Sequence, residues 1–355
     1  MAIDKPSFKI ADCPDNKTVH GWMDSVLNLS EKFNGLVPET TGDPFIKFKI
    51  NNFDIPQILN AVSDTTEKYG WHGFLSHFKD TTNITKQRTK YYGGFSITHN
   101  PDIAYPVDEH ASALGEPKAN LGTFFKSGLG IKIWMKMEEM KITHTFYKIC
   151  FEEGMQGVKT FLLHYGLISI DDNFEWADKL NSHVPSSRKG LKNGYFDTYS
   201  FRNLSTGAQT GMLGDFLTNR MQRSLCRSRA AFIDGTAWST ISKELMWHYD
   251  EPIYLNLRIN IPLQTSNNYV CEIKGDPNEY HFDVGYAYCW DTTVVHRVYA
   301  KLPEDSKRIH LVLGTIPWFD FDHDSQTYYA NEFYGEMHPF DMVANGHIIS
   351  DISVT

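Results

Sequence analysis

The feature that most constrains the fold is a series of short β-rich runs in the second half of the chain. Eight runs follow one another without an intervening helical pattern, at residues 196–202, 229–233, 244–248, 253–262, 269–273, 285–290, 294–299 and 307–315. Turn-forming pairs and triplets such as Asp234-Gly235 separate them. Many short strands joined by turns are typical of a sandwich or jelly roll. We therefore predict a double-stranded β-helix (a jelly-roll or cupin-like core) over residues 195–324.

Residues 1–194 have a different sequence pattern and are predicted to form a helix-rich, mixed region. Apolar spacing indicates helices at 17–34 and 55–69, and the alternation in FIKFKI indicates a strand at 45–50. The polar run at 187–194 is the expected boundary with the β-rich core. The fold class is therefore α+β.

The two flanking regions are expected to support the core. The N-terminal region would serve as support, lid or oligomerisation surface, and its loop-rich residues 80–130 are the candidate lid. Residues 325–355 are expected to form a C-terminal extension that packs on the core.

The composition excludes several classes of protein. The 355 residues include 34 Lys and Arg against 43 Asp and Glu, a net charge of -9. No basic surplus is available to neutralise phosphates, so we do not expect nucleic acid as a partner. No stretch of about 18 apolar residues occurs, so no membrane span is expected. The five cysteines are scattered without a C-x-x-C pair, which favours a reducing, cytoplasmic setting.

A histidine and a carboxylate lie close together in the sequence W-H-Y-D, and a second histidine follows on a later run. His248 and Asp250 are two positions apart on an extended segment, so their side chains point the same way. His296 comes 46 residues after Asp250. Two imidazoles and one carboxylate form the facial triad that holds non-haem Fe(II) and leaves coordination positions open. We therefore predict that His248, Asp250 and His296 are metal ligands and catalytic residues.

Arg308 is the candidate anchor for an organic cosubstrate. An α-keto acid bound to iron needs a fixed cation for its far carboxylate, and a guanidinium binds a carboxylate through two parallel hydrogen bonds. The strand of Arg308 is expected to pair as a hairpin with that of His296 through Pro303-Glu304-Asp305. His310, two residues further, is expected on the same strand face, either in the core or supporting the site.

Two other polar motifs are given structural interpretations. His281-Phe282-Asp283 is a second H-x-D, but only 13 residues separate Asp283 from His296, about enough for one hairpin. We expect His281 to be a surface or rim histidine. The acidic run at 320–324 lacks the glycine and the distant glutamate of an EF-hand, and is expected to be a solvated turn.

Several segments together resemble a known enzyme family. These are HYD at 248–250, LRINIPL at 257–263, CEI at 271–273, VVHRV at 294–298 and RIHLVLG at 308–314. The pattern resembles the Fe(II)/2-oxoglutarate oxygenases, and within them the aspartyl/asparaginyl β-hydroxylase-like branch, which includes free-proline hydroxylases. The similarity covers about residues 229–318.

The resemblance implies Fe(II), 2-oxoglutarate as cosubstrate and O2, with hydroxylation of an unactivated carbon of an amino-acid side chain, free or in a peptide. Arg308 matches the arginine that binds 2-oxoglutarate, and Arg258 matches an arginine near its keto-acid end. Asn260 stands where animal members carry a histidine. The family serine that contacts the distal carboxylate has no clear counterpart; Ser239 and Thr240 are nearby in sequence.

Two alternatives remain open at this stage. A jelly roll can be a non-catalytic binding or structural module. Such a module would not need two histidines, a carboxylate and an arginine at one open end of the barrel. A cupin-like metal isomerase, or a dioxygenase without a keto acid, would not need Arg308. The expected partner is a small amino acid or peptide substrate, and the sequence leaves open whether the chain forms a homo-oligomer.

Overall fold

The computed structural model describes ten stretches of the chain, and every strand pair within them is antiparallel. The described residues are 5–9, 44–69, 72–73, 92–101, 109–110, 128–143, 145–146, 160–169, 198–235 and 247–355. The helix expected at 17–34, the boundary at 187–194, most of the candidate lid, and Ser239 and Thr240 lie outside them.

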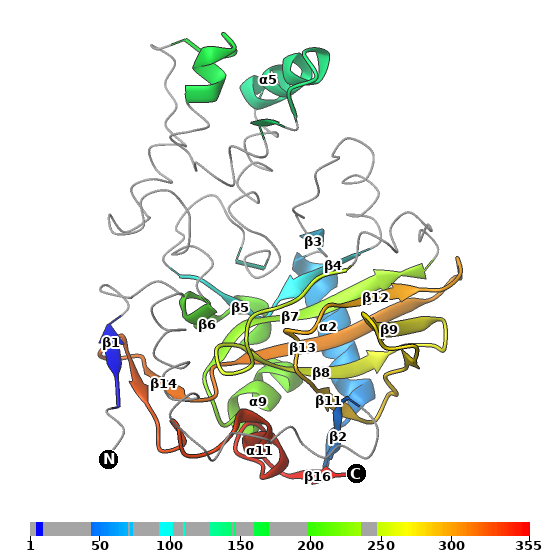
Figure 1. Ribbon diagram of the computed structural model, residues 1–355, viewed down its shortest axis with the longest axis vertical. Coiled ribbons are helices and arrows are strands. Elements are labelled where there is room, and N and C mark those ends of the chain that lie inside the picture. The colour runs from blue at the N-terminus through cyan, green and yellow to red at the C-terminus, as the bar shows by residue number, and fades with distance from the viewer. Residues whose placement is uncertain are drawn as a thin grey trace.

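The largest element is an eight-stranded sheet that gathers strands from distant parts of the sequence (Figure 1). Its order is β16 (Ile352–Val354), β2 (Ile46–Ile50), β11 (Ala287–Cys289), β8 (Leu257–Gln264), β13 (Lys307–Thr315), β7 (Leu225–Asp234), β4 (Tyr92–Ser96) and β3 (His72–Gly73). The centre of this sheet, β8–β13–β7, carries most of the residues of interest for function.

A second sheet of three strands lies over one face of the large sheet. Its order is β10 (Glu279–Tyr280), β9 (Tyr269–Ile273) and β12 (His296–Ala300). An aromatic cluster lies between the two sheets, with Phe45, Phe282, Tyr288 and Trp290 packed in one buried group with Cys271. The second sheet therefore has an inner face directed at the large sheet.

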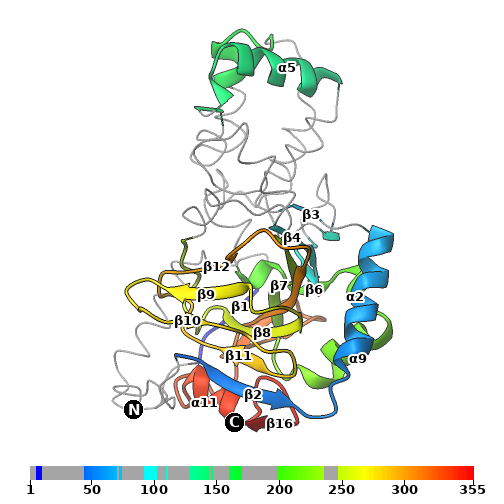
Figure 2. The ribbon, with the colours of Figure 1, turned by 90° about the vertical axis from the view of Figure 1, so that its right-hand side faces the viewer.

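Helices cover the opposite face of the large sheet, so the core has three layers (Figure 2). These helices are α2 (Ile55–Tyr69) and α9 (Gly211–Arg220). Ile58 of α2 and Phe216 of α9 belong to the same buried cluster as Ile259 and Leu311 of the sheet. Burial of this apolar surface is the main term that holds the layers together.

Side-chain alternation along β13, and along β8 up to the register shift at Pro262, lets one sheet face two different environments. Ile259 and Leu311 face the helices, whereas Asn260 and Val312 are register partners on the other face. Arg258 is two residues from Asn260 on β8, and Arg308 is four residues from Val312 on β13. Both arginines therefore lie on that second face. The polar residues of β8 and β13 thus point into the space between the two sheets.

The remaining elements lie at the periphery of these layers. They are the sheet of β1 (Ser7–Lys9), β15 (Thr327–Ala330) and β14 (Phe319–Asp322), the pair β5 (Thr98–His99) and β6 (Asn203–Leu204), the helices α5 (Gly128–Glu139) and α11 (Pro339–Ala344), and the 3-10 turns η5 (Thr198–Ser200) and η6 (Thr206–Ala208). In the described part of the chain, no helix is long and apolar enough to cross a membrane.

Several local predictions are confirmed by this architecture. The helix at 55–69, the strand at 269–273 and the strand at 307–315 have the expected bounds. The strand expected at 45–50 is β2, which starts one residue later. At the C-terminal end of the described chain, β16 is added to the edge of the large sheet beside β2.

Other local predictions are wrong. The strand expected at 196–202 is instead the turn η5, because Tyr199 packs on Phe8 and accepts a hydrogen bond from Tyr328 through its backbone oxygen. The run at 253–262 begins with a turn in which Leu255 and Asn256 both donate to the carbonyl of Pro252, and the strand starts at Leu257.

The predicted hairpin between the strands of His296 and Arg308 is also wrong. β12 pairs with β9 in the small sheet, whereas β13 pairs with β7 and β8 in the large one. The connection between them crosses from one sheet to the other: Lys301 donates to Asn268 and Glu304 donates to Gly235. These backbone bonds tie the crossing segment to both layers.

Candidate metal centre

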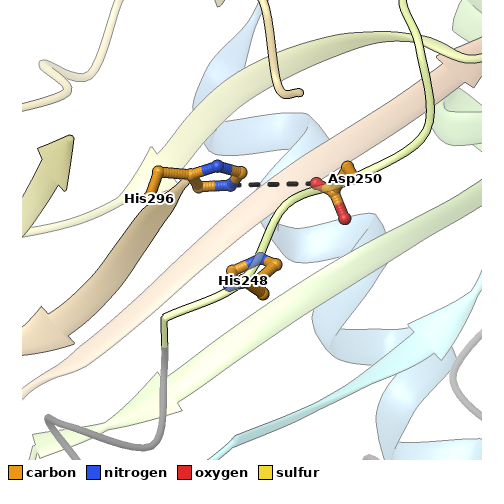
Figure 3. A group of neighbouring side chains, drawn as sticks. All are labelled: His248, Asp250 and His296. Carbon is orange, nitrogen blue, oxygen red and sulfur yellow. Dashed lines mark ion pairs between the residues drawn. The ribbon is translucent and has the colours of Figure 1, made fainter. Parts of the chain in front are cut away.

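His248, Asp250 and His296 converge on one point at the edge of the inter-sheet space (Figure 3). One ligand atom from each residue can be chosen so that all lie within 4.8 Å of one another. His248 is exposed, Asp250 is partly exposed and His296 is buried. The group therefore opens to solvent on the His248 side and is closed on the His296 side.

Main-chain hydrogen bonds hold the two histidines together. His248 and His296 form an antiparallel bridge, with 3.0 Å from His248 N to His296 O and 2.8 Å in the reverse direction. Asp250 N donates to the carbonyl of Thr292 at 2.8 Å. The H-x-D segment is thus attached to the start of β12 and the loop before it, which places both donor groups of the segment beside His296.

The ring of His296 is oriented by its own loop. Its Nδ1 lies 2.8 Å from the carbonyl oxygen of Val294, so Nδ1 carries the proton and donates. The lone pair of Nε2 then faces Asp250, whose Oδ2 is 3.8 Å away. Burial, and then the neighbouring His248, lower the pKa of His296, which favours the neutral ring. A neutral imidazole with a fixed tautomer is the form that binds metals.

Asp250 is held as a carboxylate by its surroundings. Burial by itself would raise the pKa of Asp250, but Arg258 and then the two histidines lower it to about 2. The guanidinium of Arg258 forms an ion pair with Oδ2 of Asp250. A carboxylate has about four lone-pair sites, so this ion pair leaves acceptor capacity for a cation.

The resemblance placed Arg258 near the keto acid, and here the same guanidinium bridges two carboxylates. Besides Asp250, it donates to Oε2 of Glu251 at 2.7 Å. Glu251 in turn forms an ion pair with Arg227 of β7 and accepts from Asn256 at 3.3 Å. A largely buried chain of three charged residues, Arg258, Glu251 and Arg227, therefore stands behind the carboxylate of the candidate centre.

Arg308 and His310 lie side by side on the inner face of β13. The Nη2 of Arg308 is 2.7 Å from Nδ1 of His310, and both side chains are buried. Because an arginine only donates, Nδ1 of His310 accepts and its proton sits on Nε2. Burial, and then Arg308, lower the pKa of His310 well below its usual range, so the ring is neutral. Asn260, also buried, shares this face on β8.

Buried polar atoms without a protein partner occur around the inter-sheet space. Within the described residues, His310 Nε2, Trp290 Nε1 and Thr292 Oγ1 have no hydrogen-bond partner. Trp290 packs edge-on against His296 at 5.8 Å, and the carbonyl of Thr292 accepts from Asp250. A buried donor without a partner costs about 1–3 kcal/mol, so these atoms suit a space that receives a polar ligand.

The donor chemistry fits a non-haem iron site. Two imidazole nitrogens and a carboxylate oxygen form a mixed N,N,O set that leaves room for further ligands. Among the described residues, this is the one group of three or more histidine, cysteine or acidic side chains with metal-binding geometry. The second H-x-D is not part of it: His281 and Asp283 are exposed, and Asp283 pairs with Lys47 at 3.0 Å. The expectation of a surface histidine is confirmed.

The acidic run at 320–324 is partly as expected. Asp322 and Asp324 are exposed, and Asp322 accepts from Ser325 and from the backbone of Asp324. Asp320 instead forms a two-pronged ion pair with Arg223, at 2.9 and 3.1 Å. Asp320 belongs to strand β14 and not to the turn, so this part of the run has a structural role.

The comparison with protein families agrees with the geometry. Residues 192–316 match the model of the aspartyl/asparaginyl beta-hydroxylase family, so the suspected resemblance is confirmed for this segment. The segment contains all six residues singled out from the sequence: His248, Asp250, His296, Arg258, Asn260 and Arg308. No curated protein matches the chain. The segment is thus similar to a hydroxylase family over the residues that hold the candidate centre.

Sequence analysis missed Glu251 and Arg227. Glu251 follows Asp250 directly in the sequence. A charged residue next to a candidate metal ligand is normally expected to be a solvated surface side chain. Arg227 and Arg229 alternate with small or apolar residues in CRSRAAFI, which is the available signal that one face of β7 is polar and inward. Both arginines are largely buried, and the charge of Arg229 also lowers the pKa of Asp250.

Proposed function

We propose that the protein is a Fe(II)- and 2-oxoglutarate-dependent dioxygenase that hydroxylates an unactivated carbon of an amino-acid side chain, free or in a peptide. One observation carries this proposal: His248, Asp250 and His296 converge in a segment that matches a hydroxylase family. The two sheets that face each other across this site are proposed to be the two halves of a jelly-roll core.

Each residue has a defined role in this proposal. His248, Asp250 and His296 would hold the iron, and Val294 keeps His296 in the tautomer that binds through Nε2. When iron and 2-oxoglutarate are bound, they supply activation of O2, with oxidative decarboxylation of the cosubstrate to succinate and CO2. The protein residues bind, orient and shield these groups.

Arg308 is proposed to anchor the distal carboxylate of 2-oxoglutarate. It is a buried cation on the inner face of β13, and a guanidinium can bind a carboxylate through two parallel donors. His310 presents an unpartnered Nε2–H from the same face and can donate to the same carboxylate. Asn260 lies on the neighbouring strand as a further polar contact. The substrate would enter from the exposed His248 side.

The test is production of succinate. Purified protein is incubated with Fe(II), 2-oxoglutarate and pools of free amino acids and short peptides, and succinate and substrate mass are followed. The proposal expects 2-oxoglutarate turnover that rises with one pool, together with a mass increase of one oxygen in a member of that pool. A non-catalytic module would give no succinate above a metal-free control with any pool.

A further inference from the structure

The charged network behind Asp250 involves residues that the proposed function does not use. Arg227, Glu251 and Arg258 form a chain of ion pairs that ends at Asp250. All four side chains are largely buried, with 6% of Arg258, 14% of Asp250, 17% of Glu251 and 24% of Arg227 exposed. Burying four charges is costly unless each is paired, and here each is.

The network begins at an irregular point of β7. Between Arg229 and Cys226 the register with β13 shifts, so two residues of β7 stand opposite Leu313 alone. Arg227 lies at this bulge with a φ of +42°, a left-handed backbone conformation that residues other than glycine rarely adopt. Such backbone conformations persist where the surrounding structure requires them. The bulge places the guanidinium of Arg227 on Glu251.

Neighbouring residues are adapted to the same bulge. A Cβ at Gly314 would collide with the carbonyl of Cys226 and with the side chain of Asn256. Ser228 fills the gap in the ladder, since Gly314 N donates to its hydroxyl at 3.0 Å. Asn256 can therefore approach closely and donate to Glu251 at 3.3 Å. Glu251 is held from three sides.

Charge balance gives the network a direct effect on cation binding. Asp250 and Glu251 carry two negative charges, and Arg227 and Arg258 carry two positive charges. Without Glu251, the carboxylate of Asp250 would be the single negative charge beside Arg258 and Arg227. The surplus positive charge would oppose the binding of a divalent cation. With Glu251, Arg258 is shared between two carboxylates.

We propose that Glu251 and Arg227 are positioning residues for the metal centre: they clamp Arg258, which holds the carboxylate of Asp250 in place for the metal. The inference rests on the proposed function, and it reassigns Arg258 from the cosubstrate to the ligand carboxylate. Partners that orient a metal ligand typically contribute about 10–100-fold to metal affinity.

The test is the affinity of the purified full-length protein for Co(II), a stand-in for Fe(II) that is not oxidised by air, followed through its visible absorption bands. Glu251→Gln removes the charge and keeps the shape. Arg227→Lys keeps the charge and removes the planar fork. Arg223→Lys is the matched control, because Arg223 makes a similar ion pair with Asp320 and contacts no residue of the centre. Folding is checked by circular dichroism and melting with a chelator present.

The inference expects both test variants to bind Co(II) about 10–100-fold more weakly than wild type, with altered band positions. The control should bind Co(II) within about twofold of wild type. Its melting temperature should fall less than those of the test variants, because the carboxylates that Arg223 contacts are more exposed than Glu251. Wild-type affinity and bands in Glu251→Gln and Arg227→Lys would overturn the inference. If one variant does not fold, the other decides. A wild-type protein that binds no Co(II) would instead overturn the proposed function itself.

Discussion

His248 and His296 exchange two backbone hydrogen bonds, of 3.0 and 2.8 Å, although they are 48 residues apart in the sequence. Their ring centroids are 4.4 Å apart as a result. The main chain, and not the side chains, therefore brings these two imidazoles together. Substitution of either ring leaves the bridge in place, so ligand loss and misfolding can be separated.

Replacing either histidine is expected to abolish metal binding at the centre. His248→Ala removes an exposed ring and should leave the chelator-treated melting temperature almost unchanged, whereas buried His296→Ala should lower it. In both variants, the affinity for Fe(II) measured by anaerobic titration should fall by more than about 100-fold, beyond the usual effect of a supporting residue. Binding of near-normal strength in either variant would exclude this ligand set.

Arg308→Leu is expected to weaken 2-oxoglutarate binding without weakening iron binding. A charge-assisted pair is worth about 1.5–3 kcal/mol, which corresponds to about 10–150-fold in the cosubstrate dissociation constant. The control ligand is 2-oxopentanoate, which has the same keto-acid end and no distal carboxylate. Its affinity should be the same in wild type and variant; an equal loss for both ligands would mean that Arg308 acts elsewhere.

His310 is expected to make the fold less stable in acid. Because burial and then Arg308 lower the folded-state pKa of His310, only the unfolded chain takes up a proton below about pH 6.5. The buried neutral ring of His310 therefore makes its full contribution to the free energy of unfolding above that pH. It is lost by up to about 1.4 kcal/mol per pH unit as the pH falls from 6.5 toward the folded-state pKa.

Urea unfolding at pH 7.5 and pH 5.5 tests this statement. Other histidines also contribute to the wild-type pH dependence, so the informative quantity is the difference between wild type and His310→Phe. The variant should lose about 1 kcal/mol less free energy of unfolding between these two pH values. An identical loss in both proteins would show that His310 is protonated in the folded state as well.

Gly314→Ala is expected to destabilise the protein, since the added Cβ would meet the carbonyl of Cys226 and the side chain of Asn256. Overpacking of this kind costs about 1–3 kcal/mol, measured by urea unfolding with a chelator present. The same variant should also weaken Co(II) binding, because Asn256 supports Glu251. A stable variant with normal Co(II) affinity would contradict the description of the bulge.

Sequence reasoning succeeded where the signal was local. The strands at 269–273 and 307–315 are short, largely apolar runs bounded by turn residues, and the helix at 55–69 has a continuous apolar stripe. Pairing was harder to predict, because the partners are far apart. β2 and β4 come from the first hundred residues and join strands from residues 225–315, which no local periodicity indicates.

The candidate site divides in the same way. The spacing of His248, Asp250 and His296 was sufficient to predict them as candidate metal ligands. In an extended segment, side chains two residues apart point the same way, as those of His248 and Asp250 are expected to do. The network of Arg227 and Glu251 could not be foreseen in this way. It depends on a bulge in β7, where one extra residue breaks the alternation on which the prediction relies.

In the proposed function, His248, Asp250 and His296 form an iron site that also binds 2-oxoglutarate. The most direct measurement is an anaerobic titration of the metal-free protein with Fe(II) and then 2-oxoglutarate, following the weak visible charge-transfer band of the chelate. We expect a band that needs both components and is absent in Asp250→Ala and His296→Ala. No band and no thermal stabilisation by either component would contradict the claim, and would make these histidines structural residues of a binding module.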